Sequence, residues 1–465
     1  MNPRQPTCRL SLEERLERAA SVANLAMLRE YAEPSPIQVE SINWLTFLLE
    51  SDLRALPLDD TPTRTRVLDQ LDINRSILAP IRRLPIELLS DIFFLVLDES
   101  PLRTLQAATI ISHVCKTWRN VARELGALWT KMVVETLDDF DEYCERFLPI
   151  TKHSPLELRC DNQEIIWELW DDMASYASRW RRITLGARVS MLQDLKVLYM
   201  ERLERLVIFA YDAPVSPLLS VLDFVVAPRL RHIGLTLDVL QSERQLHVPV
   251  SHTLTSLRIE SMSPFPITYV LPLLRSCAET LQVLTLTTRH PSDGTEVSCP
   301  TIASEIFEMV SLTDLRINDS SCALLNHITA PLLAELVLSA VPAYGSRSLL
   351  GFLTRNQESR HLIDFRVYRT EERDISVWIP CLRLMNSVRD LHFDELLSNE
   401  DFLKLLTRRP DEPPLLPSLR KIAMTNIFFE HEELQGLIRR MCASRAKMIT
   451  YCGHQAVVPL GWFKD

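Results

Sequence analysis

The sequence predicts a multidomain protein in which an all-α N-terminal part is followed by an α/β part with a curved parallel sheet. Two patterns support this prediction. Apolar residues recur at helical spacing in the first 131 residues, and a short unit of the form L-x-x-L-x-L recurs after residue 145. A chain of 465 residues is also too long for one ordinary hydrophobic core.

Composition excludes several classes of function. The net charge of −10 argues against a nucleic-acid-binding surface, because neutralising phosphates requires clustered lysine and arginine. Nine glycines, none in a G-x-G, leave no phosphate-binding loop, and ten cysteines without a C-x-x-C pair give no zinc motif. The polar start Met1–Leu10 and the short apolar run Ile92–Leu97 predict neither a secretion signal nor a membrane span. We therefore expect a cytoplasmic or nuclear protein without metal or cofactor.

The N-terminal part reads as helices separated by prolines. Residues 1–34 contain one expected helix, Ser11–Tyr31, and residues 35–80 form a helical lead-in with expected helices Ile37–Leu56 and Arg66–Leu78. These helices could form a hairpin, pack on the next part of the chain or dimerise as a short coiled coil. Because the heptad pattern does not persist for three repeats, packing within the chain is favoured.

Three further short helices are expected within residues 81–131. The first follows Leu84-Pro85 and carries one broad apolar face. The second and third cover Leu102–Ile111 and Ser112–Leu125. A module of this size cannot bury all of its large apolar residues alone, which points to a partner or to a neighbouring domain.

Two signatures in this module resemble an F-box. They are Leu84-Pro85-x-Glu87-Leu88-Leu89-x-x-Ile92-Phe93 and Val114-Cys115-Lys116-x-Trp118-Arg119, and the lead-in resembles that of the expanded F-box families of basidiomycete fungi. The resemblance implies that the module docks on a Skp-type adaptor and, through it, on the cullin and RING subunits of a ubiquitin ligase of the SCF kind. The docking residues implied by position are Leu84, Pro85, Leu88, Ile92, Phe93, Val114, Cys115 and Trp118, of which Trp118 could equally belong to the module's own core.

The repeating unit fills residues 145–465. Its starts are about 21 to 31 residues apart, Trp180 opens an earlier member, and Ser154–Cys160 would be a capping strand. The pattern resembles divergent leucine-rich repeats, and because the asparagine of that family is missing from most units, we expect an irregular solenoid with one curved parallel sheet. The units start at Leu203, Leu230, Leu254, Leu281, Leu312, Leu333, Leu362, Val388 and Leu419.

Helical stretches are expected between the strands, at Phe265–Cys277, Ser304–Val310, Ser348–Thr354 and Asp401–Arg408. In each strand the fourth and sixth positions of the unit would point into the core, so the third and fifth would face the concave side. There we expect a surface of mixed charge that binds a polar segment of a target protein, although a solvated face of neutralising ion pairs is the alternative. The candidate residues are Arg258, Asp314, Arg316, Glu335, Asp364, Arg366, Asp390 and His392.

The sequence therefore predicts a substrate-recognition subunit of an SCF-type ubiquitin ligase. No residue stands in a recognisable nucleophile or acid–base motif, so we expect a non-catalytic subunit. One alternative is a non-enzymatic scaffold that uses the F-box-like module outside a ligase. Another is an active site within the solenoid, which would require titratable groups converging in a pocket.

Overall fold

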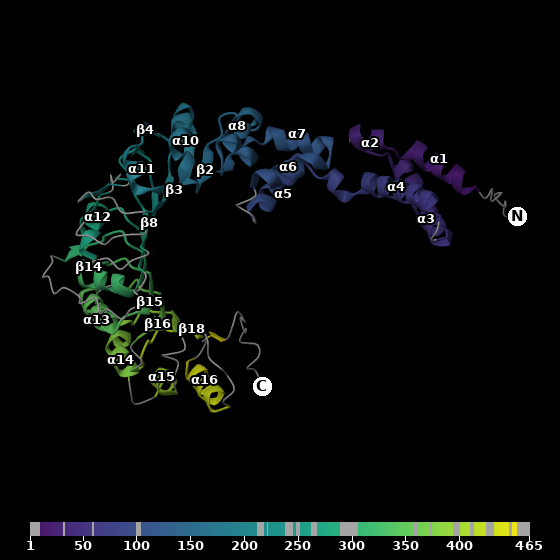
Figure 1. Cartoon of the computed structure of the whole chain (residues 1–465). Coiled ribbons are helices and arrows are strands. Elements are labelled where there is room, and N and C mark those ends of the chain that lie inside the picture. Colours follow the sequence, from purple (N-terminus) through teal and green to yellow (C-terminus); the bar gives the residue numbers. More distant parts are fainter. Residues whose placement is uncertain are drawn as a thin grey trace. The chain divides into compact units, whose positions relative to one another are not determined.

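A computed structural model divides the chain into two compact units (Figure 1). The first unit comprises Met1–Val133 and Asp141–Ser154, and the second comprises Val134–Phe140 and Pro155–Asp465. The structure describes residues 10–30, 33–57, 60–98, 104–211, 218–220, 222–237, 245–247, 252–261, 267–288, 306–357, 360–371, 374–393, 400–409, 413–424, 432–445 and 449–452.

The first unit begins with four helices that pack on one another. They are α1 (Leu12–Val22), α2 (Leu25–Glu30), α3 (Pro36–Ala55) and α4 (Thr61–Leu78). Ser11 and Ser35 begin α1 and α3 with reciprocal capping hydrogen bonds. One shared core joins α1, α3 and α4, in agreement with packing within the chain; its buried residues are Leu16, Ala19, Leu45, Leu49, Val67 and Leu71.

The single helix expected over Ser11–Tyr31 is in fact two helices. Ala23 leaves the helical conformation with φ of −138°. The side-chain oxygen of Asn24 then accepts a hydrogen bond from the backbone N–H of Met27 at 3.1 Å, so that Asn24 begins α2. Asparagine is among the best residues for starting a helix in this way, which explains why the apolar periodicity continues while the helix does not.

The second part of the first unit has its own core. It contains η1 (Pro80–Arg83), α5 (Ile86–Asp98), α6 (Thr104–Val114), α7 (Lys116–Glu124), η3 (Gly126–Trp129) and α9 (Leu148–Thr151). It also contains α8 (Leu137–Arg146) from Asp141 onward. The Trp129 ring donates to the carbonyl of Ala122 at 2.7 Å, and the Tyr143 hydroxyl donates to the carbonyl of Trp129 at 2.7 Å. The buried residues are Leu89, Phe93, Leu97, Ala108, Ile111, Val121, Ala122, Leu128 and Trp129.

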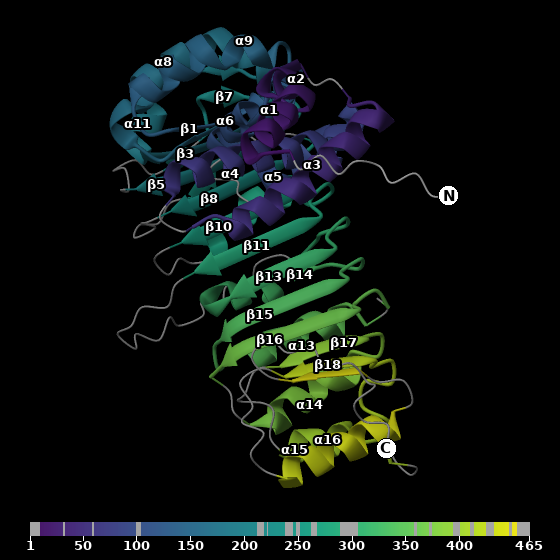
Figure 2. The ribbon, with the colours of Figure 1, turned by 90° about the vertical axis from the view of Figure 1, so that its right-hand side faces the viewer.

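The second unit is built on one large sheet whose strands pair in parallel, in their order along the chain (Figure 2). Strand β1 (Lys131–Val134) ends where this unit begins. Short parallel pairs lie beside the sheet: β4 (Leu198–Tyr199) with β7 (Val225–Val226), β6 (Leu218–Ser220) with β9 (Gln245–His247), and β12 (Phe307–Glu308) with β14 (Ile328–Thr329). The strands of the large sheet in this unit are β2 (Leu156–Cys160), β3 (Trp180–Arg188), β5 (Arg205–Tyr211), β8 (His232–Leu237), β10 (Ser256–Ser261), β11 (Val283–Thr288), β13 (Asp314–Asn318), β15 (Glu335–Val341), β16 (Asp364–Thr370), β17 (Asp390–Phe393), β18 (Lys421–Met424) and β19 (Ile449–Cys452).

Helices cover one face of this sheet, and the opposite face is here named the open face (Figure 1). The expected helix at Ser304–Val310 is wrong, because its described residues 306–310 contain strand β12 and no helix. The other expected helical stretches hold helices in their described residues. The helical segments are η4 (Gln163–Ile165), α10 (Ile166–Met173), η5 (Ala174–Arg179), α11 (Val189–Gln193), η6 (Ile267–Tyr269), α12 (Leu271–Ser276), η7 (Asp319–Asn326), α13 (Gly345–Arg355), α14 (Ile375–Leu384), α15 (Glu400–Leu406) and α16 (Glu432–Ser444).

Three buried rows of apolar side chains hold the strands in register, one row for each apolar position of the repeating unit. In the row of the fourth position, for example, Leu257 pairs with Leu284, and Leu315 pairs with Leu336. Every first, fourth and sixth position from Leu254 to Phe393 is less than 9% exposed. Full burial of one such side chain contributes about 1.5 to 3 kcal/mol. The prediction of N-terminal helices followed by an α/β region with a large parallel sheet is thereby confirmed.

A buried arginine fastens the C-terminal end of the second unit. Arg445 is 2% exposed, and its guanidinium donates to the carbonyls of Leu406 at 2.7 Å, Leu416 at 2.7 Å and Leu415 at 2.5 Å. Burial, together with Arg408, lowers the pKa of Arg445 to about 10, so the group stays charged at neutral pH. The three carbonyls compensate the buried charge and join α15 and the segment after it to α16.

We expect Arg445→Leu to open this end of the unit locally. The carbonyls of Leu406, Leu415 and Leu416 would each lose a donor, although Leu416 would keep the N–H of Leu419 at 3.1 Å. A buried group left unsatisfied costs about 1 to 3 kcal/mol. Hydrogen exchange followed by mass spectrometry should show faster exchange in α15 and α16, with β5 to β11 unchanged. Arg440→Leu, at an exposed position of α16, is the matched control. Equal exchange in the two variants would contradict the assigned role.

Candidate docking and target-binding surfaces

The second F-box-like signature builds the start of α7. Cys115 precedes the helix, and its Sγ accepts a hydrogen bond from the backbone N–H of Trp118 at 3.5 Å. The Trp118 ring packs against Phe93, with centroids 5.0 Å apart, and Arg119 Nε donates to the carbonyl of Ser112 at 3.1 Å. These residues therefore fix α7 against α5 and α6.

The first signature starts α5 and leaves an apolar stripe of that helix exposed. Pro85 lies directly before the helix, and its carbonyl accepts from the N–H of Leu89 at 3.0 Å. The α5 stripe consists of Leu88, Ile92, Leu95 and Val96, spaced so that they share one side of the helix. Leu88 is 50% exposed and Leu95 66% exposed, whereas Ile92 is half-buried.

A second exposed stripe lies on α6. Ile110 is 62% exposed and Val114 is 57% exposed, and their i, i+4 spacing places them on the same side of the helix. Val114 was predicted from the sequence, whereas Ile110 and Leu95 were not. The sequence offered a signal for both residues in their helical spacing. Ile110 lies four residues before Val114, and Leu95 lies seven residues after Leu88. Large apolar side chains left exposed in this way mark surfaces that bind other proteins.

The predicted docking residues divide into three groups by their burial. Pro85, Leu88 and Val114 are exposed, and Leu84, Ile92, Cys115 and Trp118 are half-buried. Phe93 is fully buried in the core of the module. A protein bound to the outside of this module would therefore not touch Phe93 in this conformation.

On the second unit, the third position of each repeat forms one row across the open face. The strand register pairs Arg182 with Arg205 and Arg205 with His232, and further along it pairs Val283 with Asp314. From Arg182 to Asp390 the charge along this row changes from basic to acidic, with Ser256 and Val283 between the two ends, and Lys421 adds a basic residue after Asp390. The full row is Arg182, Arg205, His232, Ser256, Val283, Asp314, Glu335, Asp364, Asp390 and Lys421.

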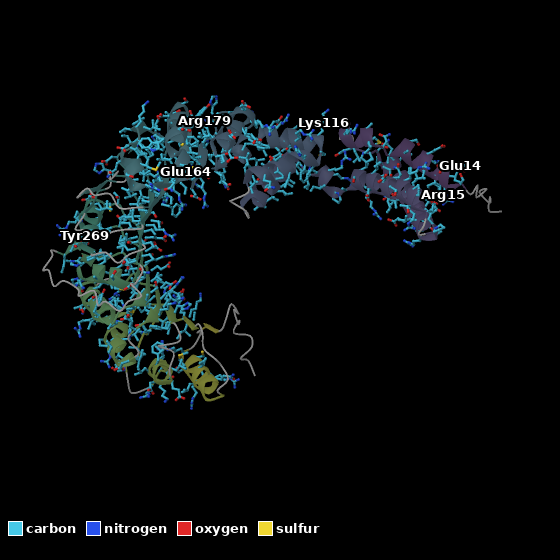
Figure 3. All side chains as sticks on the ribbon, in the orientation of Figure 1. Glu14, Arg15, Lys116, Glu164, Arg179 and Tyr269 are labelled. Atoms are coloured by element: carbon cyan, nitrogen blue, oxygen red, sulfur yellow. The ribbon has the colours of Figure 1, made fainter. Side chains whose placement is uncertain are left out.

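The fifth positions form a second row on the same face. It contains Thr184, Val207, Gly234, Arg258, Thr285, Arg316, Val337, Arg366, His392 and Ala423. All eight candidate residues of the mixed-charge surface therefore lie on the open face, side by side in two rows, and Figure 3 shows the side chains that project from these strands.

The acidic end of the first row has more carboxylates than cations. Arg316 pairs with Glu335 at 3.0 Å, and Arg366 Nε donates to Asp364 at 3.0 Å. Asp314 and Asp390 complete a set of four carboxylates, which lie beside two guanidinium groups and beside Lys421, the residue that the register pairs with Asp390. Hydrogen bonding to Asp364, against the opposing effect of burial, raises the pKa of Arg366.

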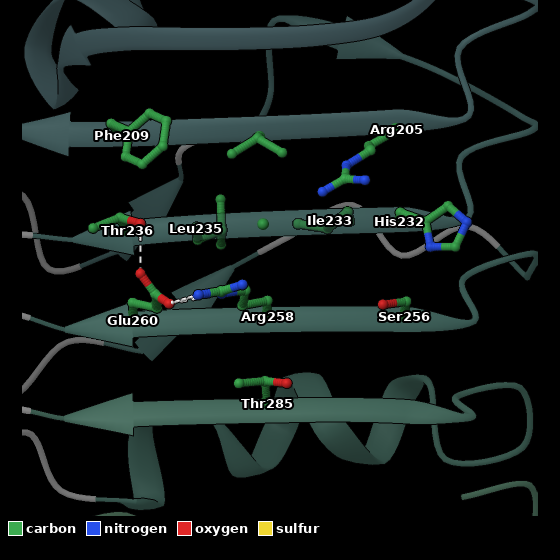
Figure 4. A pocket seen from close by; sticks show the side chains of 12 residues that line it. Arg205, Phe209, His232, Ile233, Leu235, Thr236, Ser256, Arg258, Glu260 and Thr285 are labelled. Carbon is green, nitrogen blue, oxygen red and sulfur yellow. Dashed lines mark hydrogen bonds and ion pairs between the residues drawn. The ribbon is translucent and has the colours of Figure 1, made fainter. Parts of the chain in front are cut away.

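The basic end contains a hollow of about 400 Å³ on β5, β8 and β10 (Figure 4). Its floor is open because Gly234 has no side chain, while Val207 and Phe209 supply apolar walls. Arg205 and His232 lie at one end of the hollow, and Phe209 and Thr236 lie at the other. Arg205, His232 and Gly234 were not predicted as site residues, although they occupy third and fifth positions of repeating units that the sequence shows.

Some of the arginines around the hollow have ion-pair partners among the described residues, and one does not. Arg258 forms an ion pair with Glu260, and Arg182 pairs with Glu157 at 3.3 Å. Within the described part of the chain, Arg205 has no ion-pair partner. Burial, followed by the nearby Arg205, Arg182 and Arg231, lowers the pKa of His232, and Glu204 opposes this effect. The lowered pKa favours the uncharged imidazole beside Arg205, whose guanidinium has no ion-pair partner among the described residues.

We expect Cys115→Ala to loosen the start of α7, because the first turn would lose its capping acceptor. A lost side-chain cap costs about 0.5 to 2 kcal/mol, and Cys115→Ser should retain the cap. Amide exchange within α7, measured by mass spectrometry, should be faster in the alanine variant than in the serine variant. If the two variants exchange alike, Cys115 does not act as the cap.

We expect His232 to titrate below the ordinary histidine pKa of 6.5. Arg205→Gln removes a neighbouring positive charge and should raise this pKa. NMR titration of histidine-labelled protein, with the signal assigned through His232→Asn, provides the measurement. Arg229→Gln is the control, because Arg229 pairs with Glu201 at 3.9 Å and is not among the groups that shift His232. An unchanged pKa in Arg205→Gln would refute this account of the site.

No helix within the described ranges is long and apolar enough to cross a membrane. Nor do these ranges bring together three or more His, Cys, Asp or Glu side chains in a way that could hold a metal ion. No family model matches the chain, and no curated protein matches it.

Proposed function

We propose that this protein is a substrate-recognition subunit of an SCF-type cullin–RING ubiquitin ligase. The part of the first unit formed by α5 to α7 would be an F-box that docks on a Skp-type adaptor. The second unit would be an irregular leucine-rich-repeat-like solenoid whose open face holds a target protein. The observation that carries the proposal is the exposure of apolar stripes on α5, which carries most of the first F-box-like signature, and on α6, whose last residue Val114 begins the second.

Exposed apolar area gives the docking surface its driving force. Removing apolar area from water stabilises an interface by roughly 25 cal/mol per Å², so several half-exposed leucine, isoleucine and valine side chains supply a useful binding energy. The core beneath the stripes is complete, because Leu89, Phe93 and Ile111 are buried. The exposed side chains are therefore available for a partner without unfolding the module.

The open face gives the chain a surface of a different kind for a target. It displays charged and polar side chains at a spacing of about 4.8 Å from strand to strand. Repeat architectures commonly bind proteins on such an extended sheet surface. The role of the chain would be positioning: it would raise the local concentration of a bound target near the ligase without making or breaking bonds.

We expect Leu88→Asp combined with Ile110→Asp to abolish capture of the adaptor. A charge placed in a buried apolar contact should weaken binding at least tenfold, which equals about 1.4 kcal/mol. Pull-down and calorimetry of the full chain with a purified Skp-type adaptor provide the measurement. Leu68→Asp is the matched control, since Leu68 lies on α4 and is 43% exposed, comparable to Leu88. Equal adaptor binding by the double variant and the control would refute docking through these stripes.

Recovery of cullin distinguishes a ligase subunit from a scaffold. In the proposed complex, the cullin and RING subunits should co-purify with the wild-type chain and be lost together with the adaptor in the double variant. If the adaptor binds and cullin is absent, the F-box-like module serves a scaffold outside a ligase.

A further inference from the structure

Charge on the first row of the open face is divided between its two ends. Arg182 and Arg205 lie at one end, Asp314, Glu335, Asp364 and Asp390 lie at the other, and Lys421 follows Asp390 as the last residue of the row. Among the side chains between them, Ser256 and Val283 carry no charge. A randomly solvated face would mix the two signs along the row, whereas here they stay separate from Arg182 to Asp390.

The basic end is also the place where the face is hollow. Gly234 leaves space between Val207 and Arg258, and a Cβ atom at this position would lie 3.3 Å from Val207 Cγ2. A side chain that enters from outside meets apolar walls and the guanidinium of Arg205, which has no ion-pair partner within the described ranges. This combination suits an acidic side chain whose methylene groups pack on the walls while its carboxylate reaches the guanidinium.

We propose that the open face binds an extended polypeptide segment lying across the strands, with an acidic side chain in the hollow at Gly234 and basic side chains on the carboxylates of β13 to β17. The inference specifies the target in the function proposed above and rests on it. Nucleic acid does not fit this surface, because the acidic end would repel its phosphates.

The strand spacing sets the distance between the two charged parts of the segment. Four strand steps separate His232 from Glu335, which corresponds to about 19 Å at about 4.8 Å per step. An extended chain advances about 3.3 Å per residue. The acidic and basic side chains of the bound segment should therefore be about six residues apart.

Individual ion pairs on this face are weak, so the segment must use both ends. An exposed pair contributes about 0 to 1 kcal/mol, and at the acidic end Arg316 and Arg366 already compete for the carboxylates. A segment with only one sign of charge would gain little at one end and be repelled at the other. Specificity thus arises from the order and spacing of charges along the segment.

The test selects binders from random twelve-residue peptides displayed on phage, with the full-length chain as bait. The expected binders carry an acidic and a basic residue about six positions apart. Peptides without this pattern, or no enriched peptides at all, would overturn the proposal.

Charge reversal then locates each end of a selected peptide. Arg205→Glu should weaken its binding about tenfold or more, and replacing the peptide's acidic residue with lysine should restore binding to this variant. Asp390→Lys should weaken binding in the same way and be rescued by an acidic residue at the basic end of the peptide. Arg347→Glu, an equal charge change at an exposed position of α13, is the control and should leave binding unchanged.

Equal affinities of Arg205→Glu and Arg347→Glu, or failure of both rescues, would overturn the inference. Adaptor capture is measured in the same variants, where it should match wild type. Loss of peptide binding with normal adaptor capture therefore concerns the open face alone. Absence of adaptor capture by the wild-type chain would instead refute the function proposed for the first unit.

Discussion

The three buried apolar rows of the second unit fix the register of its sheet and so decide which positions face outward. Because side chains alternate across a strand, burial of the fourth and sixth positions of each L-x-x-L-x-L repeat forces its third and fifth positions onto the opposite face. A slip of one residue would bring Asp314 and Arg316 into the core and expose Leu315. The cost of burying those charges holds the register. The positions of the charged residues on the open face therefore follow from the leucines beneath them.

The buried apolar rows do not restrict which side chains occupy the third and fifth positions on the open face. Gly234 illustrates this freedom, because its backbone pairs normally with Val207 and Arg258. The hollow there is not required by the strand geometry, and neither is the separation of charge along the first row. Features that the fold does not require are where selection for a binding partner can act, which is why the open face, and not the core, is the informative part of this unit.

The sequence predicted the strands of the large parallel sheet because each is specified by three apolar residues within six positions, and from Leu254 to Phe393 all three are buried. The prediction from the sequence was wrong where a local contact, and not the apolar periodicity, decides the structure. Asn24 caps a new helix within a continuous apolar pattern, so one expected helix became two. Phe93 shares the broad apolar face of α5 with Ile92, and its full burial and its contact with the Trp118 ring place it in the core. The hollow could not be predicted, because it depends on three strands meeting in one register.

The stripes on α5 and α6 and the open face of the second unit differ in the kind of interaction through which each would bind a partner. The stripes on α5 and α6 offer apolar area, whose burial is little affected by salt and favours a lasting complex. The open face offers half-exposed charges, whose attractions are individually weak and are screened over about 8 Å at physiological ionic strength. A subunit that remains attached to a ligase while exchanging one target for the next needs both kinds of surface. The distribution of leucines and charges over this chain is consistent with that division of roles.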